Sequence, residues 1–216
     1  MTDLDRARDA LVAACRHLAA RGLSPGGSGN VSVRAGDLLL VTPTGSSLSR
    51  VRAGDLALVP VDAGGGAAPG GPRASKELPL HRAVYRARPD AGAVVHLHSP
   101  AAVAASCLEP AALPRETATG PLPATTPYQV MRLGDLPVAP FAAPGSAELA
   151  DGVATLAGSA PALLLANHGS VVAGTGLDAA VDLAEELEAA AQVVLLLHGV
   201  PHRRLTAAQV AALRAR

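Results

Sequence analysis

Short strand-like segments that arrive in clusters are the feature that most constrains the fold. Segments 31–34, 38–41 and 56–61 follow one another before a second helical pattern begins. Later, segments 163–166 and 170–173 are separated by only three residues. Parallel neighbours need long crossover connections, usually helical, whereas antiparallel strands join through short turns. The clustering therefore predicts an α/β fold with a mostly antiparallel central sheet covered by helices.

Helices are expected where apolar residues recur three or four positions apart. The first runs from Leu4 to Leu23 and ends near Gly22. Further helices are expected at 77–88, 100–107, 146–156, 177–197 and 206–214, and further strands at 91–97 and 137–140. No internal repeat or linker interrupts the 216 residues, so residues 1–216 are expected to form one domain.

The composition limits the kinds of partner. Hydrophobic residues make up 49% of the chain and aromatic residues only 1%, which predicts a globular core of Ala, Val and Leu. So few aromatic rings leave almost nothing for nucleic-acid bases to stack on. The 18 basic and 18 acidic residues balance, so no net field attracts a polyanion. A small anionic substrate is still compatible, because backbone N–H groups can bind a phosphate locally.

The cellular location is expected to be cytoplasmic. Residues 1–9 are charged and carry no apolar signal region, and the apolar run 193–197 is far too short for a membrane span. Cys15 and Cys107 each lie in an apolar stretch and are expected to be buried thiols rather than a disulfide framework.

The strongest chemical signal is the pair His96 and His98. Side chains two positions apart on a strand point to the same side, so both imidazoles can reach one point. Alone, such a pair is more often two polar residues at a strand end. His168 follows another apolar strand and precedes Gly169, which permits a sharp turn. A third imidazole would complete three protein ligands with one position open, as catalytic zinc requires.

Glu77 and two glycine-rich loops add to this pattern. Glu77 begins a predicted helix, for which Ser75 is a plausible N-cap. A carboxylate there commonly interacts only with the helix dipole, but the connection could also bring it to the metal as a general base. The loops 26–30 and 42–47 offer hydroxyl and N–H groups to an anion, although each considered separately is more typical of an ordinary turn.

Together these segments resemble the class II aldolase/adducin family, including L-fuculose-1-phosphate aldolase, over nearly the whole chain. The matching motifs are Ser28-Gly-Asn-Val-Ser-Val-Arg34, Thr42-Pro-Thr-Gly45, Ser75-Lys-Glu77, Arg88-Pro-Asp-Ala91, Val94-Val-His-Leu-His98, Asn167-His-Gly169 and Ala184-Glu-Glu-Leu-Glu188. The resemblance implies a three-layer α/β/α fold and a homotetramer with active sites between subunits.

The resemblance also implies roles for individual residues. His96, His98 and His168 match ligands of zinc, with another divalent ion such as Mn²⁺ as the alternative, and Glu77 matches an acid/base residue. Tyr128 matches a tyrosine that protonates substrate in a neighbouring subunit. The positions that match phosphate-binding residues are Gly29, Asn30, Thr44, Gly45 and Ser75. Lys76 stands where fuculose-phosphate aldolase has a serine, so it could hold the phosphate or a substrate carboxylate.

The implied activity is that of a lyase acting next to the carbonyl of a small phosphorylated ketose, through a metal-stabilised enediolate. The Ser75-Lys-Glu77 run and the segment 126–131 also resemble 3-oxo-tetronate 4-phosphate decarboxylases, which would release CO₂ from a sugar-acid phosphate instead. A ribulose-phosphate 4-epimerase would have an aspartate at the position of Glu77, so the glutamate argues against epimerisation. The third alternative is a non-catalytic interaction domain like the adducin head, which lacks the three histidines that this chain retains.

Overall fold

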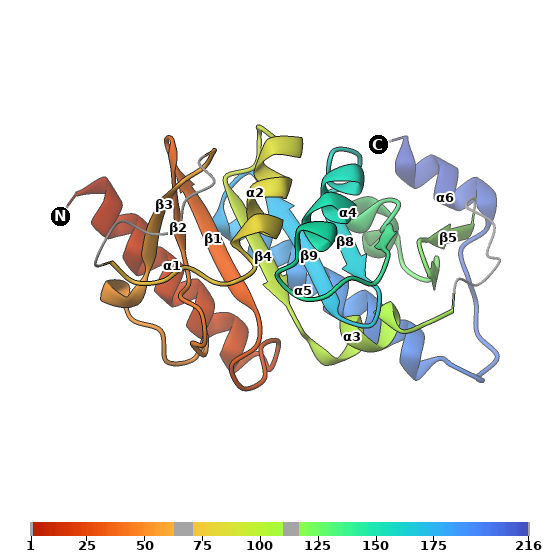
Figure 1. Cartoon of the computed structure of the whole chain (residues 1–216). Coiled ribbons are helices and arrows are strands. Elements are labelled where there is room, and N and C mark those ends of the chain that lie inside the picture. The colour runs from red at the N-terminus through yellow and green to blue at the C-terminus, as the bar shows by residue number, and fades with distance from the viewer. Residues whose placement is uncertain (1, 63–70, 110–116, 216) are drawn as a thin grey trace.

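A seven-stranded sheet forms the centre of the computed structural model, which describes residues 2–62, 71–109 and 117–215 (Figure 1). The strand order is β3-β2-β1-β4-β9-β8-β7. The strands are β1 (Asn30–Ala35), β2 (Leu38–Val41), β3 (Ala57–Pro60), β4 (Ala93–Leu97), β7 (Val138–Ala139), β8 (Ala162–Leu165) and β9 (Gly169–Gly174). Every pairing is antiparallel except β7 with β8. The mostly antiparallel sheet predicted from the clustered strands is confirmed.

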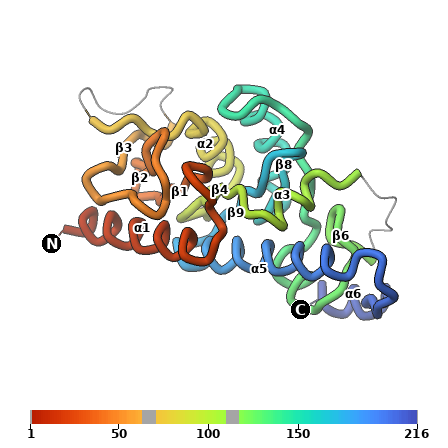
Figure 2. The backbone as a smooth tube through the Cα atoms, turned by 90° about the horizontal axis from the view of Figure 1, so that it is seen from below, coloured from red at the N-terminus to blue at the C-terminus, as the bar shows by residue number. Residues whose placement is uncertain are grey.

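Helices cover both faces of the sheet, which gives the three layers expected. The helices α1 (Asp3–Ala20) and α5 (Leu177–Leu196) lie together on one face (Figure 2). On the opposite face α2 (Leu78–Ala87) packs against α4 (Ala147–Ala157). The short helix α3 (Pro100–Ser106) follows β4 and packs on α5.

The smaller elements were only partly foreseen. The last helix, α6 (Ala207–Arg214), begins one residue after the predicted start, because Thr206 is its N-cap. A short 3₁₀ turn η1 (Ala53–Asp55), the two-residue strands β5 (Ala118–Thr119) and β6 (Leu122–Pro123), and the π-type turn η3 (Gln129–Leu133) were not predicted. Elements this short carry too few residues to show a periodic pattern. No helix of the described residues is long and apolar enough to cross a membrane.

The core is divided between the two faces by the alternation of the strands. On β4, Ala93, Val95 and Leu97 pack toward α1 and α5, whereas Val94 packs toward α2 and α4. His96 therefore points to the α2 side as well. The core consists almost entirely of Ala, Val and Leu, and Tyr85 is the one buried residue among the Phe and Tyr side chains that the structure describes. The core composition predicted from the scarcity of aromatic residues is confirmed.

Both cysteines are free, but only one is buried. Cys15 lies in the buried face of α1. Cys107 follows the last residue of α3 and is exposed, so the expectation that it is buried is wrong. The apolar stretch around Cys107 is mostly alanine, and the helix ends one residue before it, which turns its side chain away from the core.

Candidate metal centre

The end of β4 presents two imidazoles to one point. His96 is fully buried, and its Nδ1 lies 2.8 Å from the carbonyl oxygen of Ser170 on β9. A carbonyl oxygen only accepts hydrogen bonds, so Nδ1 carries the proton and Nε2 turns its lone pair away from that contact. The Nε2 of His98, two residues along, lies 3.1 Å from the Nε2 of His96. The strand thus fixes both rings toward a common site.

His168 reaches the same site from the turn between β8 and β9. The backbone N–H groups of Asn167 and His168 donate to the backbone oxygen and the hydroxyl of Ser106 on α3, at 3.1 and 3.3 Å. Asn167, with φ 56°, takes the left-handed conformation of the turn. Gly169 is needed for a different reason from the sharp turn expected there. A Cβ at that position would lie 2.3 Å from the carbonyl oxygen of Leu97, so glycine allows β9 to approach β4.

Glu77 approaches the histidines from the start of α2. It is the N-cap residue of this helix, so the prediction of Ser75 as the cap is wrong by two positions. The hydroxyl of Ser75 instead accepts from the backbone N–H of Glu77 at 3.2 Å. The carboxylate of Glu77 makes no capping bond and is directed to the imidazoles. The helix start therefore positions a carboxylate that the helix itself does not use.

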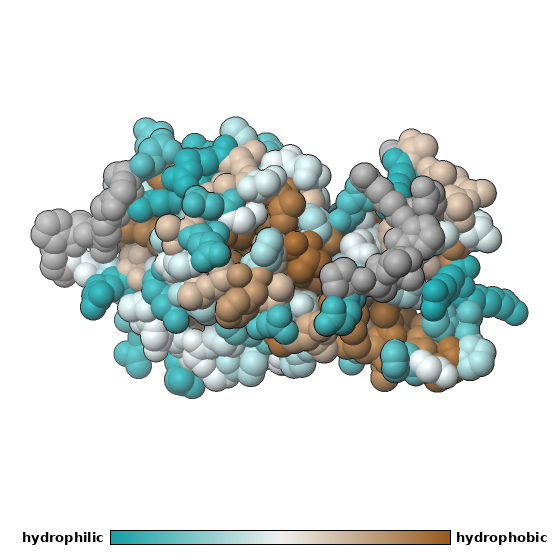
Figure 3. Space-filling view, turned by 45° about the vertical axis from the view of Figure 1, so that its right-hand side comes forward, coloured by the Kyte–Doolittle hydropathy of each residue, from teal (hydrophilic) through white to brown (hydrophobic). Residues whose placement is uncertain are grey.

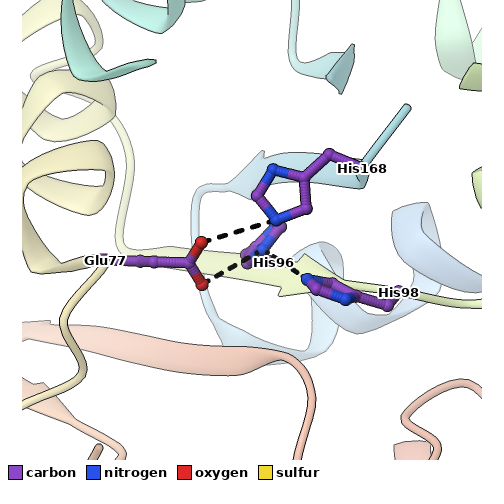
Figure 4. A group of neighbouring side chains, drawn as sticks. All are labelled: Glu77, His96, His98 and His168. Carbon is purple, nitrogen blue, oxygen red and sulfur yellow. Dashed lines mark hydrogen bonds and ion pairs between the residues drawn. The ribbon is translucent and has the colours of Figure 1, made fainter. Parts of the chain in front are cut away.

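The four side chains converge as Figure 4 shows, with all their ligand atoms within 4.8 Å of one another. Oε2 of Glu77 lies 3.3 Å from Nε2 of His96, and Oε1 lies 3.5 Å from Nε2 of His168. The three rings are mutually edge-on, with centroids 4.8–4.9 Å apart. Segments separated by up to 91 positions in the chain, from Glu77 to His168, thus meet at one point.

The donor set fits a divalent metal ion. Oε1 of Glu77 and both ring nitrogens of His168 are buried and have no hydrogen-bond partner within the described part of the chain. Unpaired buried polar atoms are costly, and a cation between them would remove that cost. Three imidazole nitrogens with an adjacent carboxylate are the ligand types that zinc and similar ions select.

The electrostatics of the cluster favour the protonation states that bind a metal. Burial lowers the pKa of His98 to about 4, and the charges of His96, His168 and Lys76 act in the same direction. The pKa of His168 is lowered too, mainly by burial. Burial would raise the pKa of Glu77, but its contacts with His96, Asn30 and His168 outweigh burial and lower that pKa below its usual range. Neutral imidazoles and an ionised carboxylate are the forms in which these groups ligate metals, and the lowered pKa values of His98, His168 and Glu77 favour those forms.

The expected phosphate-binding residues lie on loops that the fold joins at this end of the sheet. Pro43 forms an antiparallel bridge with Ala74, and Thr44 N–H donates to the Arg73 carbonyl at 3.0 Å. This bridge brings the loop of Thr44 and Gly45 beside Ser75. Thr44, Gly45 and Lys76 are exposed, whereas Ser75 is buried.

The other two expected phosphate-binding residues have structural roles as well. Gly29 has φ 78°, and a Cβ there would lie 3.0 Å from the carbonyl oxygen of His96, so glycine is required. The side-chain amide of Asn30 donates to Oε2 of Glu77 at 2.8 Å and also contacts His81. The side chain of Asn30 is thus held by Glu77 on one side and by His81 on the other.

Tyr128 lies outside the cluster, and His81 lies behind it. Tyr128 precedes η3 with 65% of its surface exposed, and none of the four clustered side chains is hydrogen-bonded to it within the described part of the chain. His81, which the sequence analysis did not connect with the site, is fully buried next to Asn30. Its position four residues after Glu77 and four before Tyr85, on one face of α2, is the signal that could have identified it.

Comparison with known proteins decides the family. The model of the Class II Aldolase and Adducin N-terminal domain matches residues 9–195. The chain belongs to the class II aldolase/adducin family. The resemblance noted from the motifs is thereby confirmed.

Relatives within this family carry two kinds of name. A 3-oxo-tetronate 4-phosphate decarboxylase of Haemophilus influenzae is 42% identical over 97% of this chain and 96% of its own length. An L-fuculose phosphate aldolase of the same organism is 36% identical over 87% of this chain and 81% of its own. The crystal structure of YgbL from Klebsiella pneumoniae superposes with a TM-score of 0.89 at 38% identity, covering 99% of this chain and all of that one. The class II aldolase fold is therefore shown.

Proposed function

We propose that the chain is a metal-dependent lyase that decarboxylates a four-carbon 3-oxo sugar-acid phosphate. The observation that carries the proposal is the convergence of three imidazoles on a carboxylate that has one oxygen without a hydrogen-bond partner among the described residues. The higher identity to the decarboxylase, 42% against 36% for the aldolase, supports this substrate class over the phosphorylated ketose expected first.

Zinc is the proposed ion, and Mn²⁺ is the alternative. His96, His98 and His168 would hold it, because three imidazoles leave a position open for substrate. When bound, the ion supplies Lewis acidity that stabilises negative charge on the substrate oxygens.

The reaction breaks the bond between the carboxyl carbon and its neighbour in the substrate. The carboxyl group leaves as CO₂, and the bonding electron pair is delocalised toward the adjacent carbonyl oxygen. The neighbouring carbon must then receive a proton. Glu77 is the proposed carrier: its carboxylate takes up a proton from water and returns it at that carbon. Oε1 is the oxygen available for this transfer, because Oε2 is bonded to Asn30.

The remaining residues of the site would hold the two anionic ends of the substrate. Thr44, Gly45 and Ser75, with the backbone at Gly29 and Asn30, would bind the phosphate. Binding far from the breaking bond holds the substrate in a reactive position. Lys76 is exposed next to Glu77, and its charge already acts on His98 and His168. We assign it to the substrate carboxylate.

Aldol cleavage is the second candidate, since the aldolase relative belongs to the same family. In both reactions the electron pair of the broken carbon–carbon bond is delocalised toward the carbonyl oxygen next to that bond. The reactions differ in the group that departs, which is CO₂ in one and an aldehyde in the other. Metal-loaded protein should be incubated with 3-oxo-tetronate 4-phosphates and with phosphorylated ketoses, and CO₂ and aldehyde release measured separately. Rapid CO₂ release from the oxo acids is expected. Aldehyde release from the ketoses alone would replace decarboxylation by aldol cleavage, and no turnover of either class would defeat the proposal.

The proposed assembly is a homotetramer in which Tyr128 serves a neighbouring subunit. Tyr128 and Phe141 each have 65% of their surface exposed, and Met131 has 49%. Figure 3 shows that apolar side chains also reach the surface in patches on the face that it presents. Burial of such side chains against another copy would favour association. A cytoplasmic location stays a prediction, supported by the two unpaired cysteines.

A further inference from the structure

A chain of buried polar groups runs from Glu77 into the interior between β1 and α2. Glu77 Oε2 receives a hydrogen bond from the Asn30 amide at 2.8 Å. The Asn30 oxygen lies 2.5 Å from Nε2 of His81. Nδ1 of His81 lies 2.7 Å from the hydroxyl of Ser32, and Tyr85 contacts that hydroxyl at 3.0 Å. Asn30, Ser32, His81 and Tyr85 are at most 5% exposed.

Secondary structure alone brings these groups together. Glu77, His81 and Tyr85 are four residues apart and so lie on one side of α2 and its first turn. Asn30 and Ser32 are two residues apart on β1 and point to the same face of the sheet. The two rows lie against each other, and each contact joins a member of one row to a member of the other.

The hydrogen bonds from Ser32 through His81 and Asn30 to Glu77 can be donated in only one direction. The Glu77 carboxylate accepts, so the NH₂ group of Asn30 faces it and the Asn30 oxygen faces His81. His81 must then donate through Nε2. Burial lowers the pKa of His81 to about 3, so the ring is neutral and Nδ1 has no proton. Ser32 therefore donates to Nδ1. Every donor from Ser32 onward points toward the carboxylate.

We propose that His81 is a positioning residue, which locks the amide of Asn30 so that it holds Oε2 of Glu77 and leaves Oε1 for proton transfer. The inference rests on the proposed role of Glu77 as proton carrier. Without a donor at Nε2 of His81, the Asn30 amide loses the bond that sets its orientation. If the amide then turned over, its oxygen would face the carboxylate and repel it.

The hydrogen-bonded network from Glu77 to Tyr85 does not serve as a route for protons to water. Its far end, Tyr85, is 2% exposed, and the Tyr85 hydroxyl donates to the backbone oxygen of Ser32 at 3.0 Å. A buried end whose proton is already bonded offers no exchange with solvent. The network therefore acts by orientation, as residues behind a first ligand or base commonly do.

Substituting His81 tests the inference. His81→Phe fills the space of the ring and removes the donor to Asn30, whereas His81→Gln keeps an N–H near the Nε2 position. We expect His81→Phe to lower kcat about 10–100-fold per metal-loaded, folded molecule, with metal content and KM within about twofold. His81→Gln should recover most of that loss. Tyr85→Phe, which removes a buried hydroxyl at the far end, is the matched control and should lose stability with little change in kcat.

A double substitution separates positioning from a general structural effect. If His81 acts through Glu77, adding His81→Phe to Glu77→Gln should lower kcat no further. A further 10–100-fold loss in that background would overturn the inference. So would normal kcat in a folded His81→Phe protein.

A spectroscopic measurement keeps the inference testable without activity. Long-range ¹H–¹⁵N spectra of histidine-labelled protein should show His81 protonated at Nε2 and not at Nδ1, and Ser32→Ala should weaken that preference. Protonation of His81 at Nδ1 would overturn the proposed direction of the hydrogen bonds in this network. An active wild type with unaffected His81→Phe defeats only the positioning role. A wild type that turns over neither substrate class defeats the proposed function. In that case the tautomer of His81 still tests whether the network orients the Asn30 amide as proposed.

Discussion

The two carboxylate oxygens of Glu77 have different surroundings, and this difference explains how one side chain can be both fixed and reactive. Oε2 accepts from Asn30 and lies near His96, whereas Oε1 has no hydrogen-bond partner. A residue that merely favoured a helix N-terminus would not need this arrangement. It would make the capping bond that Glu77 lacks.

Replacing Glu77 with Gln should lower kcat by about 10²–10⁴-fold, because the amide cannot accept and return a proton. The near-isosteric Gln should leave metal content largely unchanged. Steady-state kinetics on metal-loaded protein measure the effect. Glu148→Gln, in the first turn of α4, is the control for loss of an acidic residue at a helix start. Near-wild-type turnover in folded Glu77→Gln protein would remove Glu77 from the mechanism.

Replacing His98 with Ala should abolish binding of the metal ion by removing one of three imidazoles. We expect about one metal per chain in the wild type and a large loss in the variant, measured by elemental analysis after gel filtration. His198→Ala, at an exposed histidine, should change nothing. Unchanged metal content in His98→Ala would show that the ion binds elsewhere.

The buried histidines should make the metal-free protein less stable as pH falls. The pKa of His81 is lowered by burial from 6.5 to about 3, so below pH 6.5 the unfolded chain gains a proton that the folded chain cannot take up. His98 has a shift of the same sign, whereas the lowered pKa of Glu77 adds to the effect only below 4.5. His81 alone should cost about 2 kcal/mol between pH 7 and pH 5.

Urea unfolding of chelator-treated protein at pH 7 and pH 5 measures this loss. His81→Gln should show a smaller difference between the two pH values, because Gln does not titrate. Equal stability of the wild type at both pH values would contradict the burial of neutral His81.

At the scale of elements, the site depends on how strands and helices end. Asn30 at the start of β1 pairs with His96 near the end of β4, which places the amide and the imidazole on neighbouring strands. The turn that carries His168 is held by Ser106 at the end of α3. The helix α3 in turn is fixed by Glu188 of α5, whose carboxylate accepts from the N–H groups of Ala101 and Ala102 at 2.9 and 2.8 Å.

Glu188→Gln should therefore destabilise the protein by about 1–3 kcal/mol, because the amide replaces one acceptor with a donor facing two N–H groups. Chemical denaturation measures the change. Asp182→Asn, at an exposed position of the same helix, should stay within about 0.5 kcal/mol of the wild type. A loss no larger than that of Asp182→Asn would show that Glu188 does not anchor α3.

At the scale of the whole molecule, the sheet gathers the site at one point while Tyr128 stays outside the cluster and exposed. If Tyr128 serves a neighbouring subunit, a variant lacking Glu77 and a variant lacking Tyr128 should complement each other. Mixed Glu77→Gln and Tyr128→Phe subunits, unfolded and refolded together, should contain about a quarter of intact sites by random pairing. Activity of the mixture measures this.

Two controls accompany that experiment. Each variant refolded alone should stay at its own low activity, and sedimentation should show a tetramer. A mixture no more active than the separate variants would contradict a shared site, and a fully active monomer would contradict the assembly itself.

Much of the fold follows from the sequence because it depends on local periodicity. The expected bounds of β2 agree with the structure, and those of α5 differ by a single residue. The cap of α2 was predicted at Ser75 because serine is a preferred N-cap residue, whereas in the structure the helix begins after Glu77, with Pro79 in its first turn. The two-residue strands β5 and β6 were missed because they exist only through pairing with each other. That residues 1–216 form one domain stays a prediction.

The sequence by itself indicated the layered α/β architecture, the family and the three histidines that are candidate metal ligands, because strand alternation and motif spacing are properties of neighbouring residues. Only the tertiary structure decided which oxygen of Glu77 is free, which way the Asn30 amide faces, and that His81 stands behind both. These depend on hydrogen bonds between residues 47 and 51 positions apart. Such a bond forms only where the packing of α2 on β1 brings donor and acceptor to within 3 Å, and no local pattern specifies that distance.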